Sequence, residues 1–254
     1  KNDLDLDKII SLDNKKRELL TKKEALQSKR NKGSKTKPNK RTVEAMKTIG
    51  SDIKKLDKDL DKINTDYNSL ISALPNIPAN DVVSGGKENN KVLKSFREQP
   101  KFDFETKDHI ELATTLGLID YKRSAKMSGS GFWTYTGDGA LLEWALLNYF
   151  IDFHRNHADY EFMIPPYLLN QNSAYVSGHL PKFKKDLYWT EDGKLCLNAT
   201  SEMMLGNYHA GEVFSISDLP KKYYALSTCF RREAGAYRTE ERGMIRGHQF
   251  NKIE

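Results

Sequence analysis

Apolar residues recur at alternating spacings of three and four along residues 42–73. The positions are Met46, Ile49, Ile53, Leu56, Leu60, Ile63, Tyr67 and Leu70. This spacing is the a/d seam of a heptad repeat and predicts a left-handed coiled coil. Residues 3–31 carry a weaker seam, with leucines at 12, 19 and 26. Gly33 and Pro38 interrupt the two seams, so the pattern predicts an antiparallel hairpin of helices, each about 40–45 Å long at ~1.5 Å per residue.

The pattern after the hairpin is that of shorter, mixed elements. Prolines 75 and 78 end the second helix, and residues 76–91, with Gly85-Gly86, predict a linker. Residues 108–118 and 138–156 predict helices, whereas 127–136, 160–164, 223–230 and 244–254 predict strands. The helix at 138–156 is apolar on more than one face, which indicates burial against its own core and against a partner. We therefore expect an arm at 1–75, a linker at 76–91 and an α+β domain at 92–254.

The surplus positive charge of the chain lies on the predicted hairpin. Residues 22–47 hold 10 basic and 2 acidic residues, in a chain whose net charge is +6. The basic residues near the tip are Lys29, Arg30, Lys32, Lys35, Lys37, Lys40 and Arg41. Taken alone, the charge is explained equally well by a solvated lysine-rich surface. Its position at the end of an arm favours contact with a polyanion such as a nucleic acid.

Composition narrows the class of protein further. The chain is 38% hydrophobic and 30% charged, and it has no apolar run near the ~20 residues of a membrane helix and no visible signal peptide. We expect a cytoplasmic protein without membrane contact, whose beginning precedes Lys1. Cys196 and Cys229 indicate neither a disulfide framework nor a zinc site. His154 and His157 are expected to be solvated, so no metal-ligating residues are predicted.

The last two predicted strands carry the candidate chemistry. Because side chains alternate along a strand, Arg231 and Glu233 share one face of the first strand. The residues that share one face of the second strand are Arg246, His248, Phe250, Lys252 and Glu254. Arginines bind phosphate, an aromatic ring stacks on a base, and carboxylates bind an ammonium or hydroxyl group. Paired as a hairpin, these strands could bind ATP and an amino acid, although a half-solvated hairpin shows the same alternation.

Several strings in the chain resemble motifs of one enzyme family. Phe-Arg-x-Glu-Ala-Gly at 230–235 and Arg-Gly-x-x-Arg-x-His-Gln-Phe-x-Lys-x-Glu at 242–254 resemble motif 2 of class II aminoacyl-tRNA synthetases. The helix, strand and proline at 138–165 resemble motif 1. Ser-Gly-His-Leu-Pro-Lys-Phe at 177–183 and Thr-Ser-Glu at 200–202 are similar to segments of the seryl branch, although a threonine at 200 could also be a helix N-cap. The chain is identified as a member of the seryl-tRNA synthetase family, bacterial type.

The resemblance implies a fold and an activity. The fold is an antiparallel sheet of six or seven strands flanked by helices, with an antiparallel coiled-coil arm that contacts the long variable arm of tRNA(Ser). The activity is that of a serine–tRNA ligase, which forms seryl-adenylate from serine and ATP and transfers serine to the 3′ end of the tRNA. Motif 1 implies a homodimer, and ATP implies Mg²⁺.

The resemblance also assigns roles to single residues. Arg231 would be catalytic and would hold the α-phosphate and the serine carboxylate. The ATP site would comprise Arg231, Arg232, Glu233, Arg246, Gly247 and Phe250, with Phe250 stacked on adenine and Arg246 on the β- and γ-phosphates. The serine site would comprise Thr200, Ser201, Glu202, Arg231 and Glu254. Gly247 stands where a β-branched residue is usual, and we expect it to loosen its strand.

One departure from the family is large. Motif 3, with a second ATP-binding arginine and the carboxylates that hold magnesium, does not follow motif 2 within the 254 residues. We therefore expect a fragment of a longer enzyme whose Mg²⁺ ligands lie beyond residue 254. The alternative is a truncated, non-catalytic paralogue that binds tRNA or dimerises. A coiled-coil structural protein would leave the second half of the chain unexplained.

Overall fold

The computed structural model describes residues 5–33, 40–157, 159–233 and 242–254. They form two units, Lys1–Lys94 and Ser95–Glu254. The first unit contains two long helices and the short 3-10 helix η1 (Lys87–Asn89), and the second contains short strands and helices. The predicted α+β class with an N-terminal helical hairpin is confirmed.

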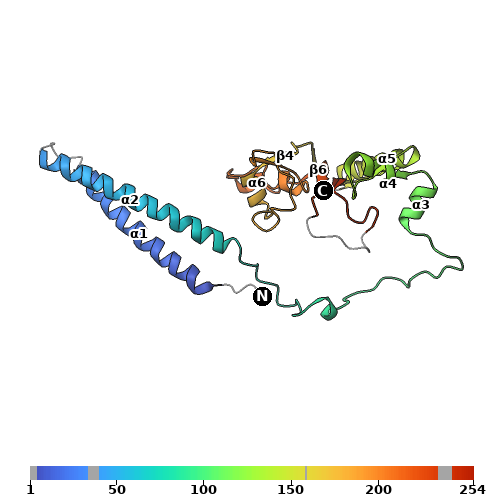
Figure 1. Cartoon of the computed structure of the whole chain (residues 1–254), viewed down its shortest axis with the longest axis horizontal. Coiled ribbons are helices and arrows are strands. Elements are labelled where there is room, and N and C mark those ends of the chain that lie inside the picture. Colours follow the sequence, from blue (N-terminus) through green and yellow to red (C-terminus); the bar gives the residue numbers. More distant parts are fainter. Residues whose placement is uncertain (1–4, 34–39, 158, 234–241) are drawn as a thin grey trace. The chain divides into compact units, whose positions relative to one another are not determined.

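The hairpin consists of α1 (Leu6–Gly33) and α2 (Lys40–Ile71) (Figure 1). Two contacts between the helices show that they are antiparallel. Lys23 Nζ pairs with Asp57 Oδ1 at 2.6 Å, whereas the earlier Lys16 lies 5.1 Å from the ring centroid of the later Tyr67. Three seam residues, Ile53, Leu60 and Ile63, are buried. The predicted seam and the helix end at Gly33 are therefore confirmed.

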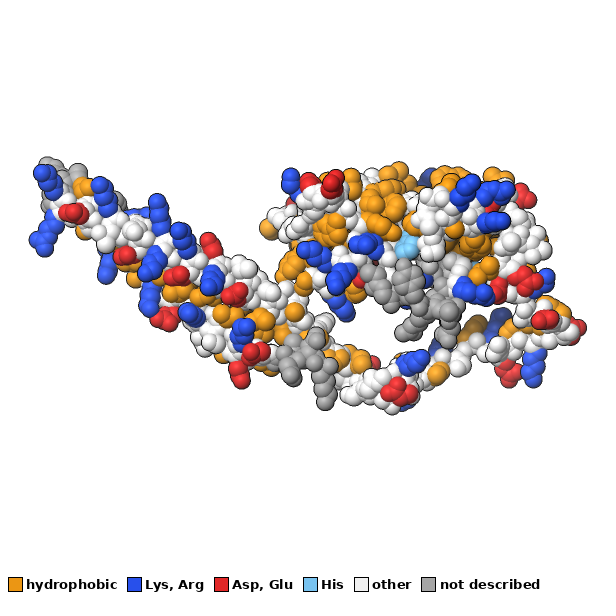
Figure 2. Space-filling view, in the orientation of Figure 1, with side chains coloured by type: hydrophobic (Ala, Val, Ile, Leu, Met, Phe, Trp, Pro, Cys, Tyr) orange, Lys and Arg blue, Asp and Glu red, His pale blue; other side chains and the backbone are white. Residues whose placement is uncertain are grey.

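The basic residues gather at one end of this hairpin. Lys29, Arg30 and Lys32 are exposed near the end of α1, and Lys40 and Arg41 are exposed at the start of α2. Figure 2 shows lysine and arginine side chains at this end and along the arm. Lys35 and Lys37, also predicted for the tip, lie outside the described residues.

A three-stranded sheet lies at the centre of the second unit, in the order β3 (Glu161–Met163), β6 (Tyr223–Phe230), β7 (Gln249–Ile253). β6 and β7 pair antiparallel, with Ser227 opposite Lys252 and Cys229 opposite Phe250. The predicted hairpin is thus confirmed. β3 runs parallel to β6, so this sheet is mixed, and within the described residues it has fewer strands than the six or seven implied by the resemblance.

Helix α5 (Asp138–His157) packs on this sheet. The Tyr224 hydroxyl donates to the Ile151 carbonyl at 3.0 Å, and Leu147 is buried. Most of the apolar side chains of α5 face outward, however. Leu142 is 63% exposed and Trp144 is 60% exposed. The expected burial of α5 against its own core therefore involves only part of the helix.

One predicted element is wrong. Residues 127–136 were expected to form a strand, but α4 (Tyr121–Ser128) covers the beginning of that range, and only β2 (Thr134–Tyr135) is extended, paired with β1 (Ile119–Asp120). The reason lies at the helix ends. Asp120 caps α4 by accepting from the Arg123 N–H at 2.7 Å, and Gly129, at φ 91°, ends it. Helix α3 (His109–Thr115) precedes this segment and is capped by Asp108.

The remaining elements surround a small apolar core. They are β4 (Leu168–Asn170), α6 (Gln171–Val176), β5 (Leu195–Leu197), α7 (Glu202–Leu205) and the 3-10 helix η2 (Ile216–Asp218). Ala174, Leu187, Cys196 and Met203 are buried together in this core. None of the helices in the described ranges is long and apolar enough to cross a bilayer.

Candidate active site

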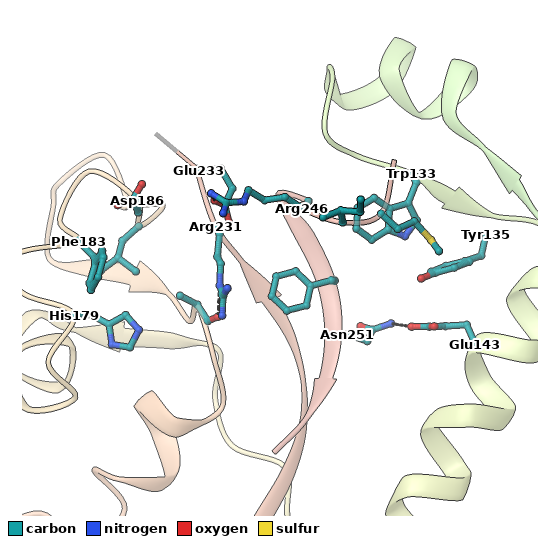
Figure 3. Close-up of a pocket in the computed structure, with 16 residues that line it drawn as sticks. Trp133, Tyr135, Glu143, His179, Phe183, Asp186, Arg231, Glu233, Arg246 and Asn251 are labelled. Atoms are coloured by element: carbon teal, nitrogen blue, oxygen red, sulfur yellow. Dashed lines mark hydrogen bonds and ion pairs between the residues drawn. The ribbon is translucent and has the colours of Figure 1, made fainter. Parts of the chain in front are cut away.

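A cavity of about 1020 Å³ lies beside the β6–β7 hairpin. It is lined by residues at the connecting end of the hairpin, by the segment around β2, by α5 and by the loop before β5. Figure 3 shows Arg231, Glu233 and Arg246 between two flanking groups, Trp133 and Tyr135 on one side and His179, Phe183 and Asp186 on the other. The cavity thus combines cationic, anionic and aromatic side chains, which suits a ligand with phosphate and aromatic parts.

Arg231 is held against the Phe250 ring. Its Cζ lies 5.0 Å from the ring centroid, a cation–π distance, and its Nε donates to the Ala199 carbonyl at 3.1 Å. The backbone N–H of Arg231 donates to the His248 carbonyl at 2.9 Å. These contacts fix the guanidinium beside the aromatic ring, where a single ligand can touch both groups.

Arg246 and Glu233 meet, but not through the alternation predicted from the sequence. β6 ends at Phe230 and β7 begins at Gln249, so Arg231, Glu233 and Arg246 all lie outside the strands. Glu233 has a left-handed backbone with φ 48°, a conformation that costs a non-glycine residue of order 1 kcal/mol or more. Its carboxylate pairs with Arg246 Nη1 at 3.3 Å. Tertiary contacts therefore bring these two groups together.

Gly247 packs closely against the Trp133 ring, and the strand expected from residue 244 begins only after it, at Gln249. The residue precedes β7, and a Cβ added there would lie 2.1 Å from Cζ3 of Trp133. Only glycine lets the backbone approach the indole so closely.

The second group of predicted residues forms a polar cluster at the end of β7. One carboxylate oxygen of Glu254 accepts from the Thr200 hydroxyl and, at 3.3 Å, from the Glu202 N–H, while the other pairs with the Lys252 ammonium. Lys252 also donates to Thr200 Oγ1 at 3.2 Å. The Thr200 hydroxyl therefore donates to Glu254 and does not cap α7, whose N-cap residue is Ser201. Burial raises the pKa of Glu254, but the hydrogen bonds and charge of Lys252 outweigh this, so its pKa is lowered overall.

Besides the three members of this cluster, two further predicted site residues do not line the cavity. Ser201 is fully buried, and its hydroxyl lies 2.8 Å from that of Ser227. Arg232 is exposed and does not line the cavity, and its backbone N–H donates to the Asp186 carbonyl at 2.8 Å.

His179 lines the cavity from the loop after α6. Burial lowers the pKa of this imidazole, which the positive charge of Arg231 also lowers, and the charges of Glu202 and Glu254 act on it in the opposite direction. Its Nδ1 lies 3.0 Å from the Ser177 hydroxyl. The sequence did not single out this residue for a role, although the string at 177–183 that contains it was noted.

Other lining residues had no signal in the sequence. Glu143 on α5 accepts from Asn251 Nδ2 at 3.3 Å, and burial raises the pKa of the neighbouring Tyr135. Asn251 and Phe250 are neighbours on β7, where side chains alternate between faces, yet both line the cavity. Alternation along a strand cannot predict such a pair.

Comparisons with known proteins agree with this arrangement. Residues 1–78 match the seryl-tRNA synthetase N-terminal domain, and residues 188–254 match the class II tRNA synthetase core domain of the G, H, P, S and T enzymes. Serine–tRNA ligase 2 of Clostridium acetobutylicum is 44% identical over 100% of this chain and 63% of its own length. Serine–tRNA ligase of Methylacidiphilum infernorum is 41% identical over 98% of this chain and 61% of its own.

Solved structures give the same result. The seryl-tRNA synthetase from Pyrococcus horikoshii complexed with ATP matches with a TM-score of 0.81 and 28% identity, over 97% of this chain and 62% of that one. The fold and the core-domain match place the chain among the class II aminoacyl-tRNA synthetases. Within that class, the chain is similar to the seryl-tRNA synthetases, both in its N-terminal domain and in the relatives and the solved structure named above. It spans about three fifths of the length of these relatives.

Proposed function

We propose that this chain carries the ATP- and serine-binding part of a serine–tRNA ligase. The observation that carries the proposal is the joint placement of Arg231, Phe250 and the Arg246–Glu233 pair around one cavity, with the Thr200–Glu254 cluster close by. The names of the relatives agree with it.

In this proposal ATP binds in the cavity. Phe250 stacks on adenine, while Glu233 and the backbone at Gly247 contact its edge. Arg231 holds the α-phosphate and Arg246 holds the β- and γ-phosphates, for which Arg246 must exchange its contact with Glu233. Mg²⁺ would arrive on the phosphates, because the described residues contain no cluster of three metal-ligating side chains.

Serine binds next to Arg231, which takes its carboxylate. Its ammonium approaches Glu254 and Thr200, and Glu202 lines the same side. Lys252 already occupies one oxygen of Glu254, so the serine ammonium shares or displaces that contact. The carboxylate then attacks the α-phosphorus in line and pyrophosphate leaves. The protein contributes positioning and charge stabilisation to this step, and no side-chain nucleophile is needed.

Serine-dependent exchange of pyrophosphate into ATP, measured on the complete protein, tests this proposal. We expect exchange with serine and none with alanine, because a pocket that hydrogen-bonds the hydroxyl rejects the analogue that lacks it by up to ~10⁴-fold. Exchange driven by a different amino acid would refute the seryl assignment, and no exchange with any would favour the non-catalytic alternative.

The arm and α5 would form the surfaces that bind the proposed partners. The exposed basic residues at the tip of the hairpin would bind the tRNA(Ser) phosphates in the cytoplasm. The exposed apolar face of α5 would form a homodimer interface, since patches of this kind rarely stay uncovered. Leu142→Asp should convert a dimer into a monomer in light scattering. An unchanged mass would place the interface elsewhere.

A further inference from the structure

The stretch of chain that leads to Arg246 is attached to the start of α3, more than 130 residues away in sequence. Arg242 Nη2 pairs with Asp108 Oδ2 at 3.0 Å. The backbone N–H of Met244 donates to Nε2 of His109 at 3.2 Å. Both contacts join residues of the same unit.

Gly243 lies between these two contacts and permits them. Its φ is +68°, and a Cβ added there would lie 2.3 Å from His109 Nε2 and 2.6 Å from Ile110 Cγ1. Glycine is therefore needed both for the left-handed turn and for the close approach to α3.

The two α3 residues are suited to holding this segment. A backbone N–H can only donate, so Nε2 of His109 is the acceptor in this contact. Asp108 uses its two oxygens separately. Oδ1 accepts from the Glu111 N–H at 2.8 Å and caps α3, and Oδ2 accepts from the Arg242 guanidinium. The same carboxylate thus orders the helix and anchors the distant segment.

The same segment is anchored again just after Arg246. Gly247 packs on the Trp133 ring, and the His248 N–H donates to the Gly131 carbonyl at 2.9 Å. Residues 244–247 precede β7 and lie outside its strand pairing, while the His248 carbonyl accepts from the Arg231 N–H at 2.9 Å. The backbone at Arg246 is therefore anchored on both sides, and its side chain pairs with Glu233.

We propose that Asp108 and His109 are positioning residues that clamp residues 242–244 and thereby hold Arg246 in place for the phosphates of ATP. This inference rests on the proposed function, because it assumes that the cavity binds ATP. Preorganisation of this kind is what makes a cationic contact effective during phosphoryl chemistry.

The test uses three variants of the clamp and one matched control in the complete protein. His109→Leu removes the acceptor, His109→Gln restores an acceptor oxygen, and Asp108→Asn keeps an N-cap but loses the charge that pairs with Arg242. Asp120→Asn is the control, because Asp120 also caps a helix and pairs with an arginine, but that arginine, Arg123, belongs to the helix that it caps. Two quantities are measured, amide hydrogen exchange in residues 242–250 and the KM values for ATP and serine in pyrophosphate exchange.

We expect His109→Leu and Asp108→Asn to raise the KM for ATP about five- to tenfold, the effect of one lost hydrogen bond, with the KM for serine unchanged. The Met244 amide should exchange roughly tenfold faster in His109→Leu. His109→Gln should behave nearly as the unmodified protein does, and Asp120→Asn should leave both KM values unchanged.

Three results would overturn the inference. Unchanged protection of Met244 in His109→Leu means that no clamp exists. Lost protection with an unchanged KM for ATP means that the clamp does not position Arg246, and an equal rise in both KM values means that its role is structural. Absence of serine-dependent exchange in the unmodified protein refutes the proposed function instead, and hydrogen exchange still decides whether the clamp exists.

Discussion

Replacing Glu254 by glutamine tests the proposed serine site most directly. The change removes the negative charge and keeps the size of the side chain. In the structure this carboxylate receives the Thr200 hydroxyl, the Glu202 N–H and the Lys252 ammonium. The glutamine oxygen can keep the Thr200 hydroxyl and the Glu202 N–H, which share one carboxylate oxygen, but its NH₂ group cannot accept from an ammonium, whether of Lys252 or of serine.

The expected loss can be estimated from these contacts. A hydrogen bond to a charged group is worth about 1.5–3 kcal/mol. At about 1.4 kcal/mol per tenfold change, we expect the KM for serine to rise between about 10- and 150-fold. The KM for ATP should stay within about twofold, because Glu254 does not line the cavity. The free energy of unfolding should fall by only about 1 kcal/mol, since the Lys252 side chain is 33% exposed and water replaces the lost partner.

The assay is pyrophosphate exchange at varied serine and ATP concentrations, with thermal unfolding as the control for folding. Lys252→Met is the matched variant, because it frees the oxygen that Lys252 occupies and should lower the KM for serine. Our reasoning fails if Glu254→Gln raises both KM values equally, or if it leaves the KM for serine unchanged while the protein stays folded.

The sign of the pH dependence follows from the lowered pKa of Glu254. A carboxylate whose pKa is lower in the folded protein stabilises the fold above its ordinary value of 4.5 and loses this contribution as the pH falls through its folded pKa. The unfolding temperature of the unmodified protein should therefore fall below about pH 4.5 more steeply than that of Glu254→Gln. Parallel curves for the two proteins would contradict the shift.

Three further predictions concern other parts of the chain. Arg231→Lys should lower kcat/KM for exchange roughly 100- to 1000-fold, because it loses the guanidinium fork, and should change thermal unfolding little; full activity would exclude Arg231 from the reaction. Gly247→Ala should lower the free energy of unfolding, measured in urea, by about 1–3 kcal/mol, because the added methyl group would overlap the Trp133 ring. Adding Trp133→Leu to that variant should recover part of the loss, and no recovery would show that the two residues do not touch. Reversing the charge of Lys29 and Arg30 should weaken tRNA binding and reduce its salt slope by about one per lost phosphate contact, with pyrophosphate exchange intact; equal loss of exchange would show that the arm is not a separate tRNA element.

The hairpin and the β6–β7 strands show how far local sequence patterns reach. The period of apolar residues predicts the seam around Ile53, Leu60 and Ile63, and Gly33 predicts the end of α1, because both depend on neighbouring residues. The apolar range expected at 223–230 coincides with β6 for the same reason. The strand expected at 127–136 was wrong at its beginning because Asp120, a cap outside that range, starts a helix that continues to Ser128.

The site shows the opposite case. Alternation correctly put Phe250, Lys252 and Glu254 on one face of β7, but it also extended the strands over Glu233 and Arg246, which meet outside the sheet. The motif placed Ser201 in the serine site, yet the fold buries this residue against Ser227.

The sequence by itself determined the helical arm, the charge at its tip, the paired strands and the family, because these depend on period, composition and local strings. Only the tertiary structure decided which side chains share the cavity. His179, Trp133 and Glu143 reach it from three separate segments, and His109 holds the chain before Arg246 from α3. Contacts between residues more than a hundred positions apart depend on how whole elements pack, and no local pattern in the sequence records that packing.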